Sequence, residues 1–411
     1  MAYKIETVII GGGQAGLATS YHLTRLNREH IVLEKAAGAG NSWRNDRWDS
    51  FTLVTPNWTF RLPGAEYDGD EPHGFMPRDE IVNRLEQYVS GFGLPVQFQT
   101  EVLSVEPVLS NRGFRVRTRD ELFISENVVI ATGLFQKPKF PALAKHLSPV
   151  INQLSSGQYR NPQELPPGAV LVVGSAQSGC QIAEELYQSG RRVYLCVGSA
   201  GRAPRRYRGR DIFEWLNDSG FMDRTVDKLE SPREKFQANP HVSGARGGHS
   251  INLHQFARDG VVLLGRLESA DDKTVRLAPN LKEKLAYADQ FEVELVKLID
   301  QYIEREEITA PAEELPQMRD GYEVQELTEL DLQAAGVTTV IWATGYRFDF
   351  SMTKFPVFDN DGYPVNKRGM TVTQGLYFVG LPWLYTQGSG LLFGVGQDAA
   401  YIAKAIAGKP T

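Results

Sequence analysis

The chain has 411 residues, of which 42% are hydrophobic and 23% are charged, a composition typical of a globular protein with two domains. Its net charge of −6 argues against a nucleic-acid-binding surface, because such surfaces depend on clustered lysine and arginine. The two cysteines, Cys180 and Cys196, exclude a disulfide framework and a CxxC redox pair, and no apolar run is long enough to span a membrane.

Residues 6–35 have the pattern of a βαβ unit: an apolar run, a glycine-rich turn, a helical stretch and a second apolar run. The turn predicts an FAD-binding loop, whose glycines permit a tight turn and close approach to a pyrophosphate at the helix N-terminus. Glu34 ends the second run, where a carboxylate accepts hydrogen bonds from the ribose hydroxyls. The other predicted contacts are Gly11, Gly13, Gln14, Ala15 and Gly16. Because the first run leads into these glycines and not into a cleavage site, we expect a cytoplasmic protein.

Alternating apolar and polar residues follow at 96–107 and 114–125, and they predict a small antiparallel meander inserted into the first domain. The next apolar run ends in Ala131-Thr132-Gly133, which we expect to contact the first cofactor. Proline-rich segments at 136–143 and 159–168 are the expected linkers around the crossover into the second domain.

Residues 169–197 repeat the βαβ pattern and predict a nicotinamide-dinucleotide loop, with Gly174, Ala176 and Gly179 at the three glycine positions. Further predicted contacts in this loop are Ser175, Gln177 and Ser178. No acidic residue ends the second strand, so a 2′-phosphate is not repelled, and Arg202 and Arg206 are candidates to bind it. This pattern favours NADPH, with NADH as the alternative cofactor. The downstream arginines have an alternative role as salt bridges or a solvated surface.

Residues 281–306 carry apolar residues at helical spacing and predict a long surface helix of the second domain. A second apolar run ends in Ala343-Thr344-Gly345, matching the segment at the end of the first domain. We therefore predict an α/β fold of two nested Rossmann-type domains with three-layer ββα/βαβ architecture. The predicted FAD-binding domain comprises residues 1–150 and a return segment, 341–411, and the NAD(P)H-binding domain comprises residues 151–340.

These two loops, the phrase GNSWRNDRWDSFTLVTP at 40–56 and the paired Ala-Thr-Gly segments resemble the class B flavoprotein monooxygenases, especially bacterial flavin-containing monooxygenases. The resemblance extends over essentially the whole chain. It implies that NADPH reduces FAD, that O₂ forms a flavin 4a-(hydro)peroxide, and that a nitrogen or sulfur atom of a small substrate is oxygenated. Alternatives are an NAD(P)H oxidase or flavin reductase, a Baeyer–Villiger oxygenase acting on a ketone, and a non-catalytic flavoprotein. A homodimer is the default assembly, and the histidines show no metal-ligand spacing.

The resemblance also suggests residues around the flavin. Asn57 is a candidate to contact the substrate or the reactive oxygen, and its alternative role is that of a turn residue after Pro56. Ser155 replaces the family's linker histidine, which favours the oxidase alternative, although it also suits an ordinary turn hydroxyl. Trp43 and Trp48 are candidates to cover the isoalloxazine, with core positions as the alternative. Residues expected at the pyrimidine edge, where a helix N-terminus stabilises negative charge, are Gly380, Gly388, Ser389, Gly390 and Leu391.

Overall fold

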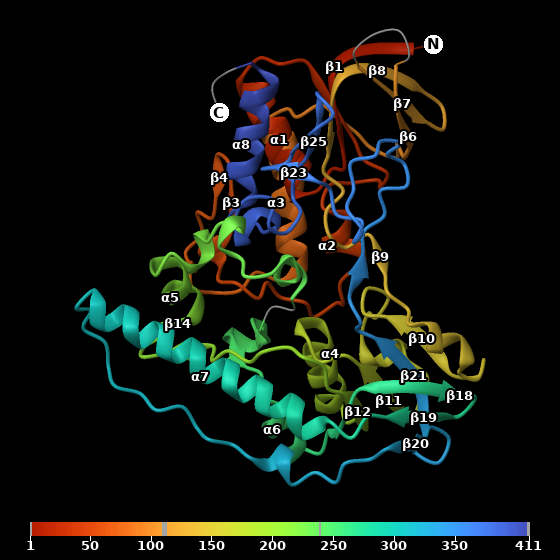
Figure 1. Cartoon of the computed structure of the whole chain (residues 1–411), viewed down its shortest axis with the longest axis vertical. Coiled ribbons are helices and arrows are strands. Elements are labelled where there is room, and N and C mark those ends of the chain that lie inside the picture. The colour runs from red at the N-terminus through yellow and green to blue at the C-terminus, as the bar shows by residue number, and fades with distance from the viewer. Residues whose placement is uncertain (1, 109–112, 238–239, 409–411) are drawn as a thin grey trace.

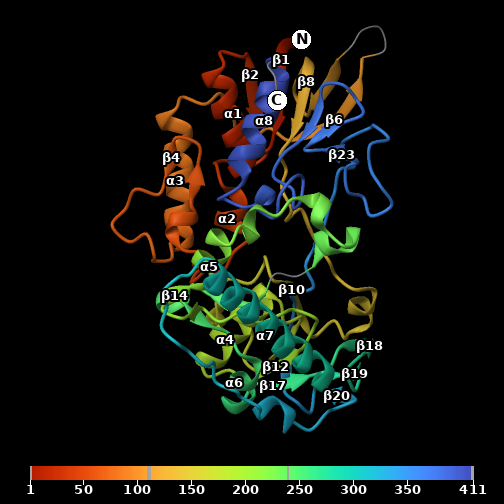
Figure 2. The same cartoon turned by 60° about the vertical axis from the view of Figure 1, so that its left-hand side comes forward.

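The chain forms two domains, each built on a parallel β-sheet, and these lie one above the other in Figures 1 and 2. The computed structural model describes residues 2–108, 113–237 and 240–408. The polypeptide begins in the first domain, crosses into the second and returns, so the two termini lie at the same end of the molecule (Figure 1). The predicted nesting of one domain within the other is confirmed.

A nine-stranded sheet forms the first domain, in the order β23-β24-β25-β8-β1-β2-β5, with β7 pairing to β8 and β6 to β7. Its strands are β1 (Ala2–Ile10), β2 (His30–Leu33), β5 (Val96–Gln97), β6 (Val102–Pro107), β7 (Phe114–Thr118), β8 (Leu122–Ile130), β23 (Asn366–Lys367), β24 (Met370–Thr371) and β25 (Leu376–Phe378). The strands β25, β8, β1, β2 and β5 are parallel. The predicted meander is confirmed, because β6, β7 and β8 pair antiparallel.

Alternating side chains of β1 separate the first domain into layers. Ile9 packs on the helical side, whereas Val8 and Ile10 pack against the meander. The helices of this domain are α1 (Gln14–Arg25), α2 (Asn41–Asn45), α3 (Arg78–Gly91) and α8 (Val395–Ile406). Helices α1 and α8 lie side by side against the sheet (Figure 1). A glycine-rich turn followed by an amphipathic helix thus produces one face of the core, as the sequence pattern predicts.

The second domain contains a five-stranded parallel sheet in the order β10-β21-β11-β12-β17. Its strands are β10 (Asn152–Ser155), β11 (Ala169–Val173), β12 (Val193–Cys196), β17 (Val262–Leu264) and β21 (Val337–Trp342). Its helices are α4 (Gln177–Gln188), α5 (Ile212–Asp218), α6 (Leu253–Arg258) and α7 (Leu281–Arg305). Val170 and Val172 face the α4 side, and Leu171 and Val173 face the sheet of β18 (Leu267–Asp271), β19 (Thr274–Leu277) and β20 (Glu329–Asp331). The three-layer architecture is therefore present here too.

Two short strands carry the chain between the domains. They are β9 (Lys137–Pro138) and β22 (Tyr346–Arg347), which pair antiparallel between the two main sheets (Figure 1). The chain returns to the first domain after β21, which ends at Trp342. The remaining two-stranded ribbons are β3 (Arg61–Leu62) with β4 (Ala65–Glu66), β13 (Arg206–Tyr207) with β14 (Arg210–Asp211), and β15 (Val242–Ser243) with β16 (His249–Ser250).

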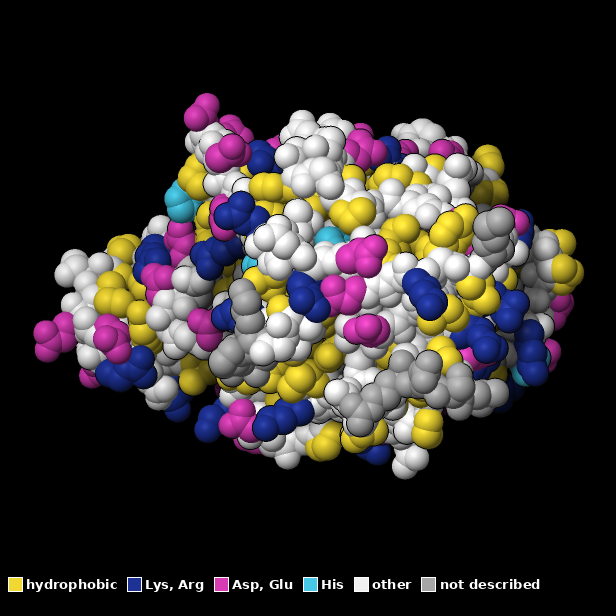
Figure 3. Space-filling view, turned by 90° about the horizontal axis from the view of Figure 1, so that it is seen from above, with side chains coloured by type: hydrophobic (Ala, Val, Ile, Leu, Met, Phe, Trp, Pro, Cys, Tyr) yellow, Lys and Arg dark blue, Asp and Glu magenta, His cyan; other side chains and the backbone are white. Residues whose placement is uncertain are grey.

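The surface carries charges of both signs. Seen from above the first domain, basic and acidic side chains are interspersed with apolar ones (Figure 3). Within the described part of the chain, no helix has the length and hydropathy needed to cross a bilayer.

Candidate functional site

The first glycine loop joins β1 to α1, and glycine occupies its three key positions for different structural reasons. Gly11 has φ +110°, and a Cβ there would lie 2.6 Å from the Ala131 carbonyl oxygen. At Gly16 a Cβ would lie 1.9 Å from the Gly11 oxygen, so helix and strand require a glycine for close packing. At Gly13 a Cβ would meet nothing within 4 Å. The protein therefore leaves space at Gly13, at the N-terminus of α1.

Glu34 lies beside this loop with its side chain buried. Its Oε2 accepts a hydrogen bond from the Gly12 backbone N–H at 2.5 Å, and its Oε1 accepts one from the Ala36 N–H at 2.8 Å. Each carboxylate oxygen retains a lone pair for another donor. The position fits the predicted contact with a pair of ribose hydroxyls.

The C-terminal segment contacts the N-terminus of α1. Gln14 donates from Nε2 to the Gly390 carbonyl at 3.0 Å and accepts at Oε1 from Trp43 Nε1 at 3.3 Å. Gly380 has φ +81°, and a Cβ there would lie 2.4 Å from the Ala15 Cβ. The loop before α8 contains a short 3₁₀ turn, Gln387–Gly390, in which the Ser389 hydroxyl accepts from the Tyr385 and Thr386 N–H groups at 3.0 Å each. The turn ends at the exposed Leu391, and the contacts of Gly380 and Gly390 bring this segment to the first loop.

The second loop repeats this geometry between β11 and α4. Gly174 has φ +107°, and its Cβ would lie 2.6 Å from the Ala343 oxygen. A Cβ at Gly179 would lie 1.8 Å from the Gly174 oxygen. Ser175 is buried, and its hydroxyl accepts from the Gly198 N–H at 2.9 Å. The Gln177 side chain binds the Val242 backbone, because its Oε1 accepts a hydrogen bond from the Val242 N–H at 3.2 Å. Ser178 follows in the first turn of α4.

The two Ala-Thr-Gly segments meet where the domains join. Gly133 and Gly345 have φ +73° and +81°, and each segment turns into one strand of the β9–β22 ribbon. The Thr132 hydroxyl accepts from Gln136 at 2.9 Å, and the Thr344 hydroxyl donates to the Lys139 carbonyl. In each domain the strand before the glycine loop is parallel to the strand before the Ala-Thr-Gly segment: β1 to β8, and β11 to β21. Each loop therefore lies at the same sheet edge as its Ala-Thr-Gly segment, and both loops border one interdomain junction.

Aromatic side chains line this junction. The rings of Phe135 and Tyr346 meet edge to face at 5.2 Å, and each ring follows one Ala-Thr-Gly segment. The Arg47 guanidinium lies 4.5 Å from the Phe135 ring centroid and 5.5 Å from that of Trp43. Burial lowers the pKa of Arg47, whose Nη1 donates to the Asp46 backbone carbonyl at 2.7 Å. Trp43 is thus placed beside the first loop, whereas Trp48 is buried against Phe51.

The arginines after β12 form hydrogen bonds and salt bridges with other groups of the same chain. Arg202 donates to Asp289 and to Glu292, at 2.7 Å each, and is buried. Burial lowers the pKa of Arg202, but its bonds to these carboxylates outweigh that effect and raise it. Arg206 donates to the carbonyls of Gly248 and Gly247 at 3.1 and 3.0 Å. Further salt bridges join Arg205 to Asp211, Arg208 to Asp300 and Arg210 to Asp218. This geometry favours the salt-bridge alternative over 2′-phosphate binding.

The two candidate catalytic residues also have structural partners. Asn57 is buried in a 3₁₀ turn, Asn57–Thr59; its Oδ1 accepts from the Met76 N–H at 2.6 Å and its Nδ2 donates to the Glu71 carbonyl at 2.9 Å. Ser155 is buried at the end of β10, and its hydroxyl lies 2.9 Å from Gln158 Oε1. These contacts favour the turn role for each residue over direct contact with a substrate.

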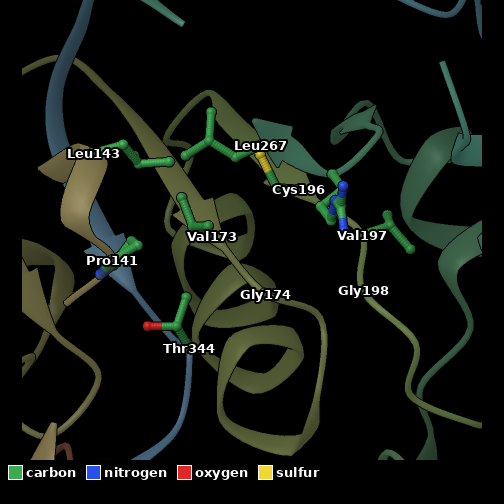
Figure 4. A pocket seen from close by; sticks show the side chains of 10 residues that line it. Pro141, Leu143, Val173, Gly174, Cys196, Val197, Gly198, Leu267 and Thr344 are labelled. Atoms are coloured by element: carbon green, nitrogen blue, oxygen red, sulfur yellow. The ribbon is translucent and has the colours of Figure 1, made fainter. Parts of the chain in front are cut away.

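A pocket lies beside the second loop, at the carboxyl edge of the second sheet, and the sequence analysis anticipated some of its lining residues but not Arg266. It has a volume of about 190 Å³ and is lined by Gly174, Gly198 and Thr344 among others (Figure 4). Arg266 also lines it. Arg266 directly follows the Leu263-Leu264-Gly265 run, and an arginine just after a short apolar strand was the available signal. Arg47 was also missed, although it stands inside the phrase that carries the family resemblance.

Comparison with known proteins gives the family. The model of the pyridine nucleotide-disulphide oxidoreductase family matches residues 8–216, just over half of the chain. An uncharacterized CzcO-like oxidoreductase of Geobacillus kaustophilus is 34% identical over 98% of both chains. A probable indole-3-pyruvate monooxygenase of Arabidopsis thaliana, YUCCA1, is 28% identical over 46% of each. A flavin-containing monooxygenase structure from Stenotrophomonas maltophilia aligns with a TM-score of 0.67 at 19% identity, covering 99% of each chain.

The chain belongs to the pyridine nucleotide-disulphide oxidoreductase family. It is an oxidoreductase, and the resemblance to class B flavoprotein monooxygenases and the two-Rossmann-domain fold are confirmed. The disulphide in the family's description has no counterpart here: Cys180 and Cys196 are free and buried. Burial raises the pKa of the Cys196 thiol to about 12 and raises that of Cys180 as well, so neither is an activated thiolate.

Proposed function

We propose that the chain is an FAD-dependent monooxygenase that takes electrons from NADPH and oxygenates a nitrogen or sulfur atom of a small substrate. One observation carries the proposal: two dinucleotide loops of the same geometry border one interdomain junction. Gly11 and Gly174 both approach the carbonyl of an alanine, Ala131 and Ala343, that begins an Ala-Thr-Gly segment. An electron transfer between two dinucleotides needs this arrangement, because their reactive rings must come into contact.

The first loop fits FAD. The open space at Gly13 admits a pyrophosphate at the N-terminus of α1, where free N–H groups and the helix dipole favour negative charge. Glu34 would accept hydrogen bonds from the adenosine ribose, and Trp43 and the 387–391 turn would hold the flavin end. The second loop would hold NADPH at the N-terminus of α4, with its pyrophosphate farther from the backbone, because the methyl group of Ala176 stands where the first loop has Gly13.

When bound, the reduced flavin supplies the electrons that activate O₂. The chain's own residues would bind the two cofactors, orient the reactants and exclude water. Phe135 and Tyr346 cover the junction with apolar surface, and the positive charge of Arg47 favours an anionic group nearby. The Arabidopsis relative named as an indole-3-pyruvate monooxygenase agrees with oxygenation chemistry.

Stoichiometry tests the proposal. We expect anaerobic NADPH to bleach the flavin absorbance of the purified protein. In air, a panel of amines and sulfides should contain at least one compound for which each NADPH and O₂ consumed yields one oxygenated product. If neither NADPH nor NADH bleached the flavin, the proposal that a nicotinamide cofactor reduces it would be refuted.

A second candidate function is an NAD(P)H oxidase or flavin reductase. It is favoured by Ser155, which replaces the family's linker histidine and whose hydroxyl is bonded within its own turn to Gln158. Release of one hydrogen peroxide for every NADPH consumed, with every amine and sulfide tried, would establish this function in place of the monooxygenase.

A further inference from the structure

The pocket beside the second loop is built from the ends of three neighbouring strands. Gly174 follows β11 and Gly198 lies beyond the end of β12 (Figure 4). Arg266 lies beyond the end of β17. The parallel register aligns Val173 with Cys196 and Cys196 with Leu264, so these ends lie side by side. The carboxyl edge of a doubly wound sheet is where such folds bind ligands.

The pocket lacks the acid that the first domain has. The Gly11 N–H donates to Leu33, which precedes Glu34, and the Gly174 N–H donates to Cys196, which precedes Val197. Val197 therefore has the place of Glu34, and it is buried and apolar. A carboxylate at this place binds the two free ribose hydroxyls and repels a 2′-phosphate. Here that repulsion is missing, since none of the described residues that line the pocket is acidic.

Arg266 supplies a cation to this pocket and, among the described residues, has only a long salt bridge to a carboxylate. Its backbone is fixed, because its N–H donates to Asn280 Oδ1 at 3.0 Å and its carbonyl accepts from the Ala278 N–H at 2.8 Å. Its side chain is 69% exposed and forms a salt bridge with Glu268, whose Oε1 lies 3.6 Å from Nη2, beyond hydrogen-bond distance. Arg202 and Arg206, by contrast, already donate to protein acceptors.

We propose that Arg266 binds the 2′-phosphate of NADPH and so gives the chain a preference for NADPH over NADH. The proposal rests on the proposed function, since it requires a nicotinamide dinucleotide in the second loop. A guanidinium forms paired, charge-assisted hydrogen bonds with a phosphate, and Leu143 and Leu267 offer apolar surface to the adenine (Figure 4).

Adenosine fragments test this without turnover. We would titrate the FAD-loaded protein with adenosine 2′,5′-bisphosphate and with 5′-AMP by calorimetry. Replacing Arg266 by glutamine (R266Q) should weaken the bisphosphate about 10- to 100-fold and change 5′-AMP less than about twofold. The matched control is R276Q: Arg276 lies on β19, in the hairpin that begins directly after Arg266, is 73% exposed and lies 3.6 Å from Glu329, but it is not among the residues that line the pocket. It should leave both affinities unchanged.

A second variant adds the missing repulsion. A Cβ at Gly198 would meet only the Ser175 Oγ, at 4.0 Å, so Gly198→Glu should fold and weaken the bisphosphate more than 5′-AMP. Equal losses in R266Q and R276Q, or equal losses of the two fragments in R266Q, would overturn the proposal. So would a wild type that binds neither fragment. If such a wild type is nevertheless bleached by NADPH, the proposed function stands; if it is not, both fall together.

Discussion

At the scale of single residues, the two loops contain an internal comparison at Gly13. Gly13 and Ala176 precede their helices with nearly the same backbone, φ −86°, ψ −176° and φ −76°, ψ −172°. A methyl group is therefore compatible with this conformation, and at Gly13 it would meet no protein atom within 4 Å. The folded protein does not itself require this glycine. Its role is best explained by a group that approaches the backbone closely.

Gly13→Ala should therefore separate folding from FAD binding. We expect the stability of the FAD-free protein to change by less than about 1 kcal/mol, because only a helix N-cap is altered. FAD affinity should fall about 10- to 100-fold, since the methyl group occupies space needed by the pyrophosphate. Urea unfolding of the apoprotein and fluorescence titration with FAD measure the two effects.

Gly16→Ala is the matched comparison, because its Cβ would lie 1.9 Å from the Gly11 carbonyl oxygen. That variant should lose stability with or without FAD. If Gly13→Ala instead destabilised the apoprotein as much as Gly16→Ala, the glycine would be structural and the close-approach explanation would be wrong.

These residues also mark what sequence reasoning can reach. The glycines, Gln14 and Glu34 were predictable because a local turn and its strand spacing determine their positions. The partners of Arg202 were not: Asp289 and Glu292 lie on a helix almost ninety residues later. Asn57 likewise bonds to the backbone of a loop that no local pattern connects to it.

At the scale of elements, α7 is tied to α6 and to the arginine segment by a network around Asp289. This carboxylate accepts hydrogen bonds from Tyr322 at 2.6 Å and from Arg202 at 2.7 Å, and it lies 3.2 Å from His254 Nε2. Burial raises the pKa of Asp289, but the bonds from His254 and Tyr322 and the charge of Arg202 outweigh it and lower the pKa from 3.8 to about 2.

This lowered pKa gives the folded protein a pH-dependent stability. Between pH 3.8 and about 2, the unfolded chain binds a proton at Asp289 more readily than the folded protein does. The contribution of ionised Asp289 to the free energy of unfolding is therefore complete above pH 3.8 and is lost as the pH falls toward 2. At pH 7, Asp289→Asn should cost about 1–2 kcal/mol, and the difference from wild type should shrink by pH 3. Urea unfolding at both pH values measures it. Glu304→Gln, an exposed change on the same helix, should behave like wild type at both; an Asp289→Asn deficit as large at pH 3 as at pH 7 would contradict the assignment.

Elements with a long periodic pattern were predicted well from sequence. The helix expected at 281–306 is α7, Leu281–Arg305, and the expected meander is β6 to β8. The two-residue strands β9 and β22 were not predicted, because so short a pairing has no periodicity and depends on the two domains meeting.

At the scale of the whole molecule, Arg160 connects the domains. It lies just after β10 of the second sheet and donates from Nη1 to the Arg47 carbonyl at 3.0 Å and from Nη2 to the Asn45 carbonyl. Its own carbonyl accepts from the Asp49 N–H at 2.9 Å. All three partners belong to the segment between Trp43 and Phe51, beside the first loop. Arg160 therefore sets how the second domain sits relative to the proposed flavin site.

Arg160→Gln should slow electron transfer without removing FAD. Losing its bonds lowers the population of the arrangement that holds the two loops together, and about 1.4 kcal/mol corresponds to a tenfold slower reaction. We expect stopped-flow reduction of the flavin by NADPH to slow about tenfold, with unchanged FAD content and unchanged reduction by dithionite. Arg191→Gln is the control, because Arg191 also binds backbone carbonyls, those of Pro162, Leu165 and Pro166, but entirely within the second domain. It should cost stability while leaving the reduction rate unchanged. If both variants slowed reduction equally, general loosening of the second domain would explain the effect, and the contacts of Arg160 with the first domain would have no special part in it.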